Sequence, residues 1–218
     1  MLSFPEPAEV PEAQRASARI GIRYEDVAQD GSLKVGAMPN VVGMVCFRDL
    51  WSQARIHSEL AGSGVVPILS RLCIESIDGP ISVRTLVEAR GQFQIAHQRG
   101  ENDEVRRIFL RMHALLSASR GRTHDPQPSG AGEVVPIGQV YAEHIFTRPF
   151  AEPDRRRVQA LDLSEGPWLP EDCYSARAGA SLLQLPAGAR WLEPEAGPDE
   201  AAFCFGLIHT YSNQHVNS

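Results

Sequence analysis

Residues 34–60 read KVGAMPNVVGMVCFRDLWSQARIHSEL and decide the fold. This stretch is apolar over most of its length and is too long for an ordinary strand. Its apolar residues would occupy most of the surface of a helix, and a helix that is apolar nearly all round is buried. Asn40 is the expected N-cap, with Pro39 just before it, and Gly62 and Gly64 stop the helix. The sequence therefore predicts one long buried helix.

Strand-like runs lie on both sides of this helix. Residues 18–24, ARIGIRY, alternate apolar and polar side chains, which is the period of a half-buried strand. Four runs after the helix, separated by short polar turns, have the pattern of an antiparallel meander. The last run also partly fits a helical period, and we interpret it as a strand because the other three need an antiparallel neighbour. The four runs are residues 65–75 (VVPILSRLCIE), 81–89 (ISVRTLVEA), 92–98 (QFQIAHQ) and 106–117 (RRIFLRMHALLS).

The simplest way to bury the helix is to wrap a curved antiparallel sheet around it, which is an α+β architecture. Residues 1–17 are predicted to form an N-terminal arm, and residues 18–120 the first domain. Residues 121–200 are rich in Pro, Gly, Ser and charged residues, and we expect a linker that packs along the domain surface. Residues 201–218 begin with another strand-like run. The expected anchors of the linker are Tyr141, Phe146, Phe150, Trp168, Leu182, Leu183 and Trp191.

The charge balance argues against two classes of partner. The chain has 21 basic and 27 acidic residues, a net charge of −6. A nucleic-acid groove or an anionic membrane surface needs a concentrated basic face, and residues 155–157 are the one tight basic cluster in the sequence. The N-terminus lacks the basic and apolar regions of a signal peptide, and no window approaches the ~20 apolar residues of a membrane span. A cytoplasmic location is predicted.

The four cysteines are far apart and form no CxxC pair, so the sequence suggests neither a disulfide framework nor a zinc site. Cys46 and Cys73 lie in apolar segments, where a reduced cysteine behaves as a small hydrophobe. No metal and no other cofactor is expected.

Two motifs resemble a known family. RIGIRYEDVAQDGSLK at 19–34 is similar to the opening of hotdog-fold thioesterases of the hydroxybenzoyl-CoA type, which have a strand, an Asp-rich turn and then the central helix. NQHVNS at 213–218 closely resembles an element of fatty acyl carrier-protein thioesterases. The resemblance covers 18–117 by pattern and 201–218 by motif. It implies a double-hotdog protein of which this chain holds the first hotdog, the linker, and the first strand and motif turn of the second.

The two motifs also resemble each other. FGLIHTYSNQHVNS can be laid on IRYEDVAQDGSLKV, which is an internal repeat of a strand and its turn. The repeat implies that a second hotdog begins at about Ala201. The aligned pairs are His209 with Asp26, Tyr211 with Ala28, Asn213 with Asp30, His215 with Ser32 and Asn217 with Lys34.

The resemblance implies a carboxylate in the turn before the helix and backbone N–H donors at the helix N-terminus, which hold the oxyanion of thioester hydrolysis. The first copy departs from this pattern, because Ala28 stands at the acid position and Ser32 and Lys34 replace His and Asn. Asp26 and Asp30 lie nearby as candidate substrate-binding residues, although acidic residues in a Gly-containing turn are more often structural.

The second copy keeps more of the family's residues. His215 is a candidate general base, because its pKa lies near neutrality, or a residue that stabilises the turn. Asn213 is a candidate catalytic residue and Asn217 a candidate substrate-binding residue: each could hold the substrate carbonyl or set the turn, because Asn readily adopts left-handed conformations. Tyr211 stands where the family has Asp; it cannot replace an Asp nucleophile at pH 7, but it can donate a hydrogen bond.

The leading interpretation is an acyl-thioester hydrolase acting on acyl-CoA or an acyl-carrier protein, with its active site between two hotdogs. A hotdog lyase of the dehydratase type is one alternative. A non-catalytic acyl-binding scaffold is another, because both copies lack the acid. Since the motif lies at the end of the chain, we expect a truncation, a separate second polypeptide that completes the fold, or cleavage of a longer precursor near Asn217.

Overall fold

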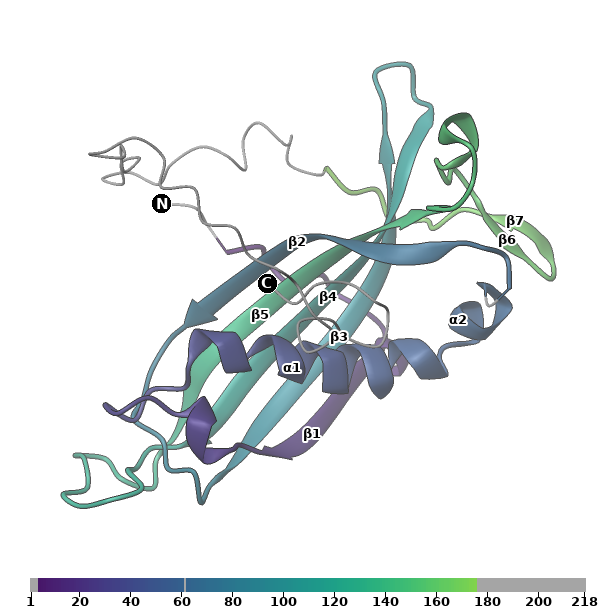
Figure 1. Cartoon of the computed structure of the whole chain (residues 1–218). Helices are drawn as coiled ribbons and strands as arrows, with labels where there is room; N and C mark the ends of the chain where they lie inside the picture. Colours follow the sequence, from purple (N-terminus) through teal and green to yellow (C-terminus); the bar gives the residue numbers. More distant parts are fainter. Residues whose placement is uncertain (1–3, 61, 176–218) are drawn as a thin grey trace, which may run out of the picture. The chain divides into compact units, whose positions relative to one another are not determined.

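The computed structural model describes residues 4–60 and 62–175, and the structural statements below concern these residues. Their main feature is an antiparallel five-stranded sheet, in the order β1-β3-β4-β5-β2, that curves around one helical segment (Figure 1). The fold is a hotdog. The predicted α+β class is therefore confirmed. The strands are β1 Arg15–Gly21, β2 Val66–Ser76, β3 Leu86–Arg99, β4 Val105–Ser119 and β5 Val134–Thr147, and a separate pair is formed by β6 Leu161–Leu163 and β7 Gly166–Trp168.

The helical segment is buried, as predicted, but it is not one regular helix. It consists of η3 Val35–Ala37, α1 Pro39–Val41, the π-helical η4 Val42–Arg48, η5 Trp51–Gln53 and α2 Arg55–Leu60. The N–H of Asp49 donates to the carbonyl of Met44 at 3.2 Å, which is the i→i+5 bond of a π-helix. The predicted N-cap is wrong: Met38 is the N-cap of α1 and Asn40 lies inside its first turn. Pro39 takes the first helical position because its missing N–H has no partner there in any case.

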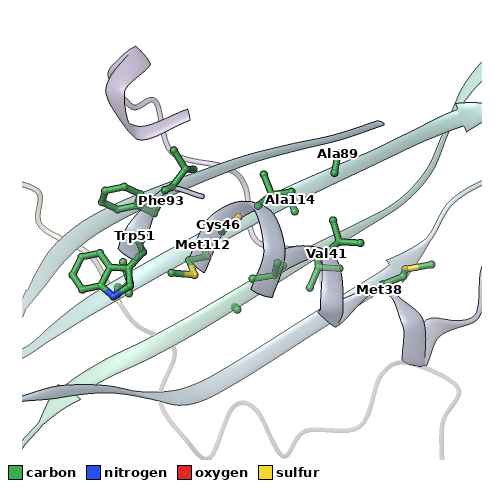
Figure 2. Close-up of a cluster of buried hydrophobic side chains, with 14 of the residues drawn as sticks. Met38, Val41, Cys46, Trp51, Ala89, Phe93, Met112 and Ala114 are labelled. Carbon is green, nitrogen blue, oxygen red and sulfur yellow. The ribbon is translucent and has the colours of Figure 1, made fainter. Parts of the chain in front are cut away.

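The core lies between this segment and the inner face of the sheet. In Figure 2 side chains of the helical segment meet those of β3 and β4. Trp51 is 1% exposed, and its ring lies 5.7 Å from that of Phe93 in an edge-to-face arrangement. Cys46 is fully buried, and burial raises the pKa of its thiol to about 12. The thiol therefore stays protonated and packs as a small apolar group, as predicted.

Strand β3 corrects one sequence prediction. Residues 81–89 and 92–98 were expected to form two strands, but Leu86–Arg99 is continuous. The Arg90-Gly91 dipeptide looks like a turn in the sequence, yet Gly91 lies where the helical segment packs directly against the sheet. A Cβ added at Gly91 would lie 2.6 Å from Cγ1 of Val45 and 2.8 Å from Sγ of Cys46. The glycine makes room for the helix and does not end the strand.

Strand β5 corrects the expected domain boundary. Residues 121–200 were expected to be a linker, but Val134–Thr147 lies between β4 and β2 and completes the sheet. Pro136 and Gly138 make this strand hard to predict from the sequence, because both residues are rare inside strands. Pro136 pairs beside the β-bulge between Leu116 and Ser117, and Gly138 leaves room for Met38, whose Cε would lie 2.9 Å from a Cβ there.

The expected linker anchors have different roles. Tyr141 and Phe146 are buried residues of β5, Trp168 belongs to β7, and Phe150 is 99% exposed. Leu182, Leu183 and Trp191 lie outside the described residues, as do the expected second hotdog strand and its turn. The predicted strands at 65–75 and 106–117 are confirmed as β2 and β4. Within the described residues no helix has the length and apolar character needed to cross a membrane.

We expect Gly91→Ala to lower the free energy of unfolding by about 1–3 kcal/mol, the usual cost of an added methyl group in a packed core. Urea denaturation of the purified protein measures this change. Gly21→Ala is the matched control, because a Cβ at Gly21 in β1 meets no atom within 4 Å. Equal effects of the two substitutions would show that the helix and sheet are not in close contact at Gly91.

Candidate functional site

The turn before the helical segment is closed by its own hydrogen bonds. The N–H of Ala28 donates to the carbonyl of Ser32 at 2.8 Å, and the N–H of Gly31 to that of Ala28 at 2.9 Å. The N–H of Lys34 donates to the carbonyl of Asp26 at 2.8 Å. Residues 26–34 therefore form a compact turn that contains Ala28.

The carboxylate of Asp26 accepts hydrogen bonds from within the turn. Arg23 donates to it from its backbone N–H at 2.9 Å and from its guanidinium at 2.8 Å, around the short helix η2 Tyr24–Asp26. The hydrogen bond from the Arg23 side chain lowers the pKa of Asp26 below its ordinary value. Asp26 is thus a structural anion whose oxygens already have donors.

Asp30 is held in a similar way. Its Oδ1 accepts from the hydroxyl of Ser32 at 2.6 Å and from the backbone N–H of Ser32 at 2.9 Å. The Ser32 hydroxyl lowers the pKa of Asp30. Neither Asp26 nor Asp30 is among the residues that line the cleft described below, and their role as substrate-binding residues stays a prediction.

The helix N-terminus offers few free donors. The N–H groups of Ala37 and Met38 bond to the carbonyls of Lys34 and Val35, and that of Val41 bonds to the carbonyl of Met38. Pro39 has no N–H. The expected oxyanion donors of this copy are therefore largely occupied by its own 3₁₀-type turns.

A cleft of about 420 Å³ opens beside Ala28. Its volume lies in the range of small-ligand sites. The wall toward the core is apolar and the rim is polar, so it can hold a partly apolar ligand with a charged or hydrogen-bonding end. The lining residues are Tyr24, Val27, Ala28, Gln29, Gly31, Ile81, Val83, Arg122, Thr123, His124 and Asp125.

Three loops are fixed against one another around this cleft. The N–H of Ile81 donates to the carbonyl of Gly31 at 2.8 Å, and the N–H of Val83 to the hydroxyl of Thr123 at 3.2 Å. Gly31 has a φ of +91°, and a Cβ there would lie 2.4 Å from Cβ of Pro80. A side chain at residue 31 would force the turn away from the second loop, so glycine is required at this contact.

Arg122, His124 and Asp125 lie at the rim, and sequence reasoning assigned their segment to a linker. The side chain of Gln127 connects this loop, accepting from the N–H of Arg122 at 2.9 Å and donating to Oδ1 of Asp125 at 3.1 Å. Among the described residues, the Arg122 guanidinium makes no ion pair. Their loop shows in the sequence only as a polar run, GRTHD at 121–125, and this pattern does not indicate that the loop meets the turn beside Ala28.

The predicted catalytic residues Tyr211, Asn213 and His215, together with Asn217 and His209, lie outside the described residues. In the part of the chain that is described, no group of three or more His, Cys, Asp or Glu residues is placed to hold a metal ion.

No protein-family model matches the chain, and no curated protein matches it by sequence. Solved structures do resemble it. A 4-hydroxybenzoyl-CoA thioesterase from Pseudomonas sp. strain CBS-3 is 13% identical, with 67% of this chain and 93% of that chain covered and a TM-score of 0.40. An acyl-CoA hydrolase from Bacillus cereus is 10% identical, with 67% and 71% covered and a TM-score of 0.42.

A third structure is a 1,4-dihydroxy-2-naphthoyl-CoA thioesterase from Synechocystis, 12% identical over 66% of this chain and 88% of that chain, with a TM-score of 0.40. Similarities of this size carry no argument about activity. The hotdog assignment rests on the strand order and the central helical segment of the chain itself.

Because the pKa of Asp26 is lowered in the folded state, its stabilising contribution is present above its ordinary pKa of 3.8 and is lost as the pH falls through the lowered value. We expect Asp26→Asn to destabilise the protein at pH 7, with a difference from wild type that shrinks toward zero as the pH falls below the lowered pKa of Asp26. Urea denaturation at several pH values measures this difference. Asp154→Asn, which alters an exposed carboxylate outside the turn, is the control; a pH-independent difference for Asp26→Asn would contradict the assignment.

Proposed function

We propose that this chain is an acyl-thioester hydrolase acting on acyl-CoA or acyl-carrier-protein substrates, and that its catalytic groups are Tyr211, Asn213 and His215. The observation that carries the proposal is the combination of a hotdog fold in residues 15–147 with the motif NQHVNS at 213–218. The first copy of the turn cannot supply the acid, because Ala28 has no carboxylate and both nearby aspartates already accept hydrogen bonds from the turn.

In the proposed reaction His215 takes a proton from water, and the oxygen of that water bonds to the thioester carbonyl carbon. The resulting oxyanion accepts hydrogen bonds from Asn213 and Tyr211, and Asn217 orients the substrate. When the intermediate collapses, the carbon–sulfur bond breaks and the thiolate takes the proton from His215. The products are a carboxylic acid and a free thiol.

The cleft beside Ala28 supports a binding role for the first hotdog in the same proposal. Its apolar wall includes Val27, Ile81 and Val83, which suits an apolar part of the substrate, and Arg122 at the rim suits an anionic part. The hotdog described here then binds substrate, and the second copy of the motif performs the chemistry.

The free edge of β2 supports a second hotdog half as a partner. Among the described strands β2 pairs with β5 alone, and Ile68, Leu69 and Leu72 are 42–51% exposed. An apolar unpaired edge is where another chain can add a strand. The opposite edge, β1, carries Arg15 and Arg19, and such charges discourage strand addition.

A non-catalytic acyl-binding scaffold is the second candidate. It is favoured by the described turn, where Asp26 and Asp30 are both bound to their own loop and the acid position is Ala28. Binding without turnover, measured by calorimetry with a hydrolysis-resistant acyl-CoA thioether, distinguishes this candidate from the enzyme.

We expect hydrolysis of a series of acyl-CoA and acyl-carrier-protein thioesters, followed by the release of free thiol. His215→Ala should lower kcat by about 10²-fold or more, because the general base is lost. Tyr211→Asp should raise kcat about tenfold or more, because it restores a carboxylate at the family's acid position. His57→Gln, a change on α2, is the matched control, and unchanged rates in the first two variants would contradict these roles.

A second polypeptide should be bound to the chain in material purified from the cells that produce it, and native mass spectrometry would detect it. Leu72→Lys places a charge on the exposed edge of β2 and should release this polypeptide. A chain that is monomeric in its own cells would contradict the proposed partner.

A further inference from the structure

Residues 148–157, here called the arginine loop, follow β5 and have a fixed backbone. The N–H of Arg148 donates to the carbonyl of Arg156 at 3.0 Å, which closes the loop at its base. Across the loop, the N–H of Ala151 donates to the carbonyl of Arg148 at 3.2 Å, and Nε of Arg156 donates to the carbonyl of Ala151 at 2.9 Å. The loop is therefore ordered before any partner arrives, which lowers the entropic cost of binding.

The arginine loop is also anchored to the rest of the domain. Thr147 and Arg157 form an antiparallel bridge at the end of β5, and the guanidinium of Arg148 is paired with the carboxylate of Asp162 on β6 at 2.7 Å. Val158, directly after the loop, is buried in the core. In Figure 1 the loop lies beside β6 and β7. The side chains of the loop are thus presented from a rigid base.

The exposed side chains of the arginine loop include one aromatic ring and three cations. Phe150 is 99% exposed, and Arg155, Arg156 and Arg157 are exposed as well. A single exposed apolar side chain is ordinary on a protein surface. Aromatic residues and arginine together, however, are enriched where proteins bind one another and often dominate the binding energy. The loop therefore has the composition of a protein-binding surface.

Two of these arginines are free to bind an anionic partner. Among the described residues, the guanidiniums of Arg155 and Arg157 form no ion pair, although Glu152 and Asp154 lie in the same loop. The loop contains the one tight basic cluster of a chain whose net charge is −6. A local basic patch of this kind attracts an acidic partner and orients its approach.

We propose that the arginine loop docks the acyl-carrier protein of the proposed reaction, with Phe150 in an apolar pocket of the carrier and Arg155 and Arg157 against its acidic side chains. This inference rests on the proposed function, and it selects the carrier protein over coenzyme A as the form in which the acyl group arrives. A small ligand such as coenzyme A needs a concave site, whereas Phe150 stands exposed on a loop. No residue of the loop lines the cleft beside Ala28.

An anionic membrane is a less favourable partner for the same side chains. A membrane is an extended plane, so it approaches the acidic groups around the loop as well as the arginines. A small protein covers only ~800 Å² of its partner's surface. Charges beyond the Debye length of ~8 Å at physiological salt are largely screened from it. The net charge of −6 therefore opposes a membrane more than it opposes a small acidic protein.

Isothermal titration calorimetry of the purified protein with an acyl-carrier protein of acidic surface tests the docking. Arg155→Glu/Arg157→Glu should raise Kd about tenfold or more, and Phe150→Ala should do the same, because both remove interface anchors. Arg156 is left unchanged, since its Nε bonds the carbonyl of Ala151 within the loop. The melting temperature should stay within about 2 °C of wild type, because the altered side chains are exposed.

Arg15→Glu/Arg19→Glu is the matched control, because it changes the net charge by the same amount at two exposed arginines of β1. It should leave Kd within about twofold of wild type. Equal weakening by this control would overturn the proposal, since net charge alone would then govern binding. Unchanged Kd in the loop variants, or no affinity of wild type for the carrier, would also overturn it. Binding to phosphatidylserine vesicles that the loop variants abolish, without carrier binding, would assign the loop to a membrane instead.

Kinetics separate the failure of this proposal from the failure of the proposed function. On acyl-carrier-protein thioesters the loop variants should lower kcat/KM about tenfold or more, while on acyl-CoA kcat/KM should stay within about twofold of wild type. Equal loss on both substrates would overturn the docking role. Absence of thioester hydrolysis in wild type would overturn the proposed function, and calorimetry would still decide whether the loop binds the carrier.

Discussion

An apolar helical segment must be shielded from water on nearly every side, and the rest of the fold follows from this constraint. The segment approaches the sheet so closely that β3 carries Gly91 at the contact, with Val45 and Cys46 directly above it. A flat sheet covers one side of a helix, whereas a curved five-stranded sheet covers more of it, because the outer strands bend around its flanks. Burial of Trp51 and Met38, each worth ~1.5–3 kcal/mol when removed fully from water, drives this wrapping.

The same close contact between helix and sheet explains where the cleft and the buried polar side chains lie. The inner face of the sheet is filled by the helical segment, so the cleft beside Ala28 opens at one end of the sheet, where loops meet. The buried polar cluster around Glu143, whose carboxylate accepts hydrogen bonds from the hydroxyls of Tyr141 and Tyr174, lies on the outer face, where residues of β4 and β5 alternate away from the core. The cleft beside Ala28 and the polar cluster around Glu143 thus lie in different parts of the domain, and neither interrupts the apolar core.

The turn before the helical segment uses its two aspartates to hold its own shape. Asp26 and Asp30 stabilise the turn by accepting hydrogen bonds from Arg23 and Ser32, and this leaves them poorly suited to activate water. Ala28, which lies between them in the sequence and lines the cleft, has no side-chain group that could donate or accept a proton.

Sequence alone determined the buried helical segment, the strands β2 and β4, and the α+β class, because each depends on a local apolar pattern. It did not reveal β5, since Pro136 and Gly138 look like breaks until the bulge in β4 and the side chain of Met38 are placed beside them. It also divided β3 at Gly91, because the helix above that glycine is distant in sequence. Arg122 and His124 at the cleft, and Tyr174 on Glu143, were likewise beyond its reach. These contacts join residues far apart in the chain, and only tertiary packing brings such residues together.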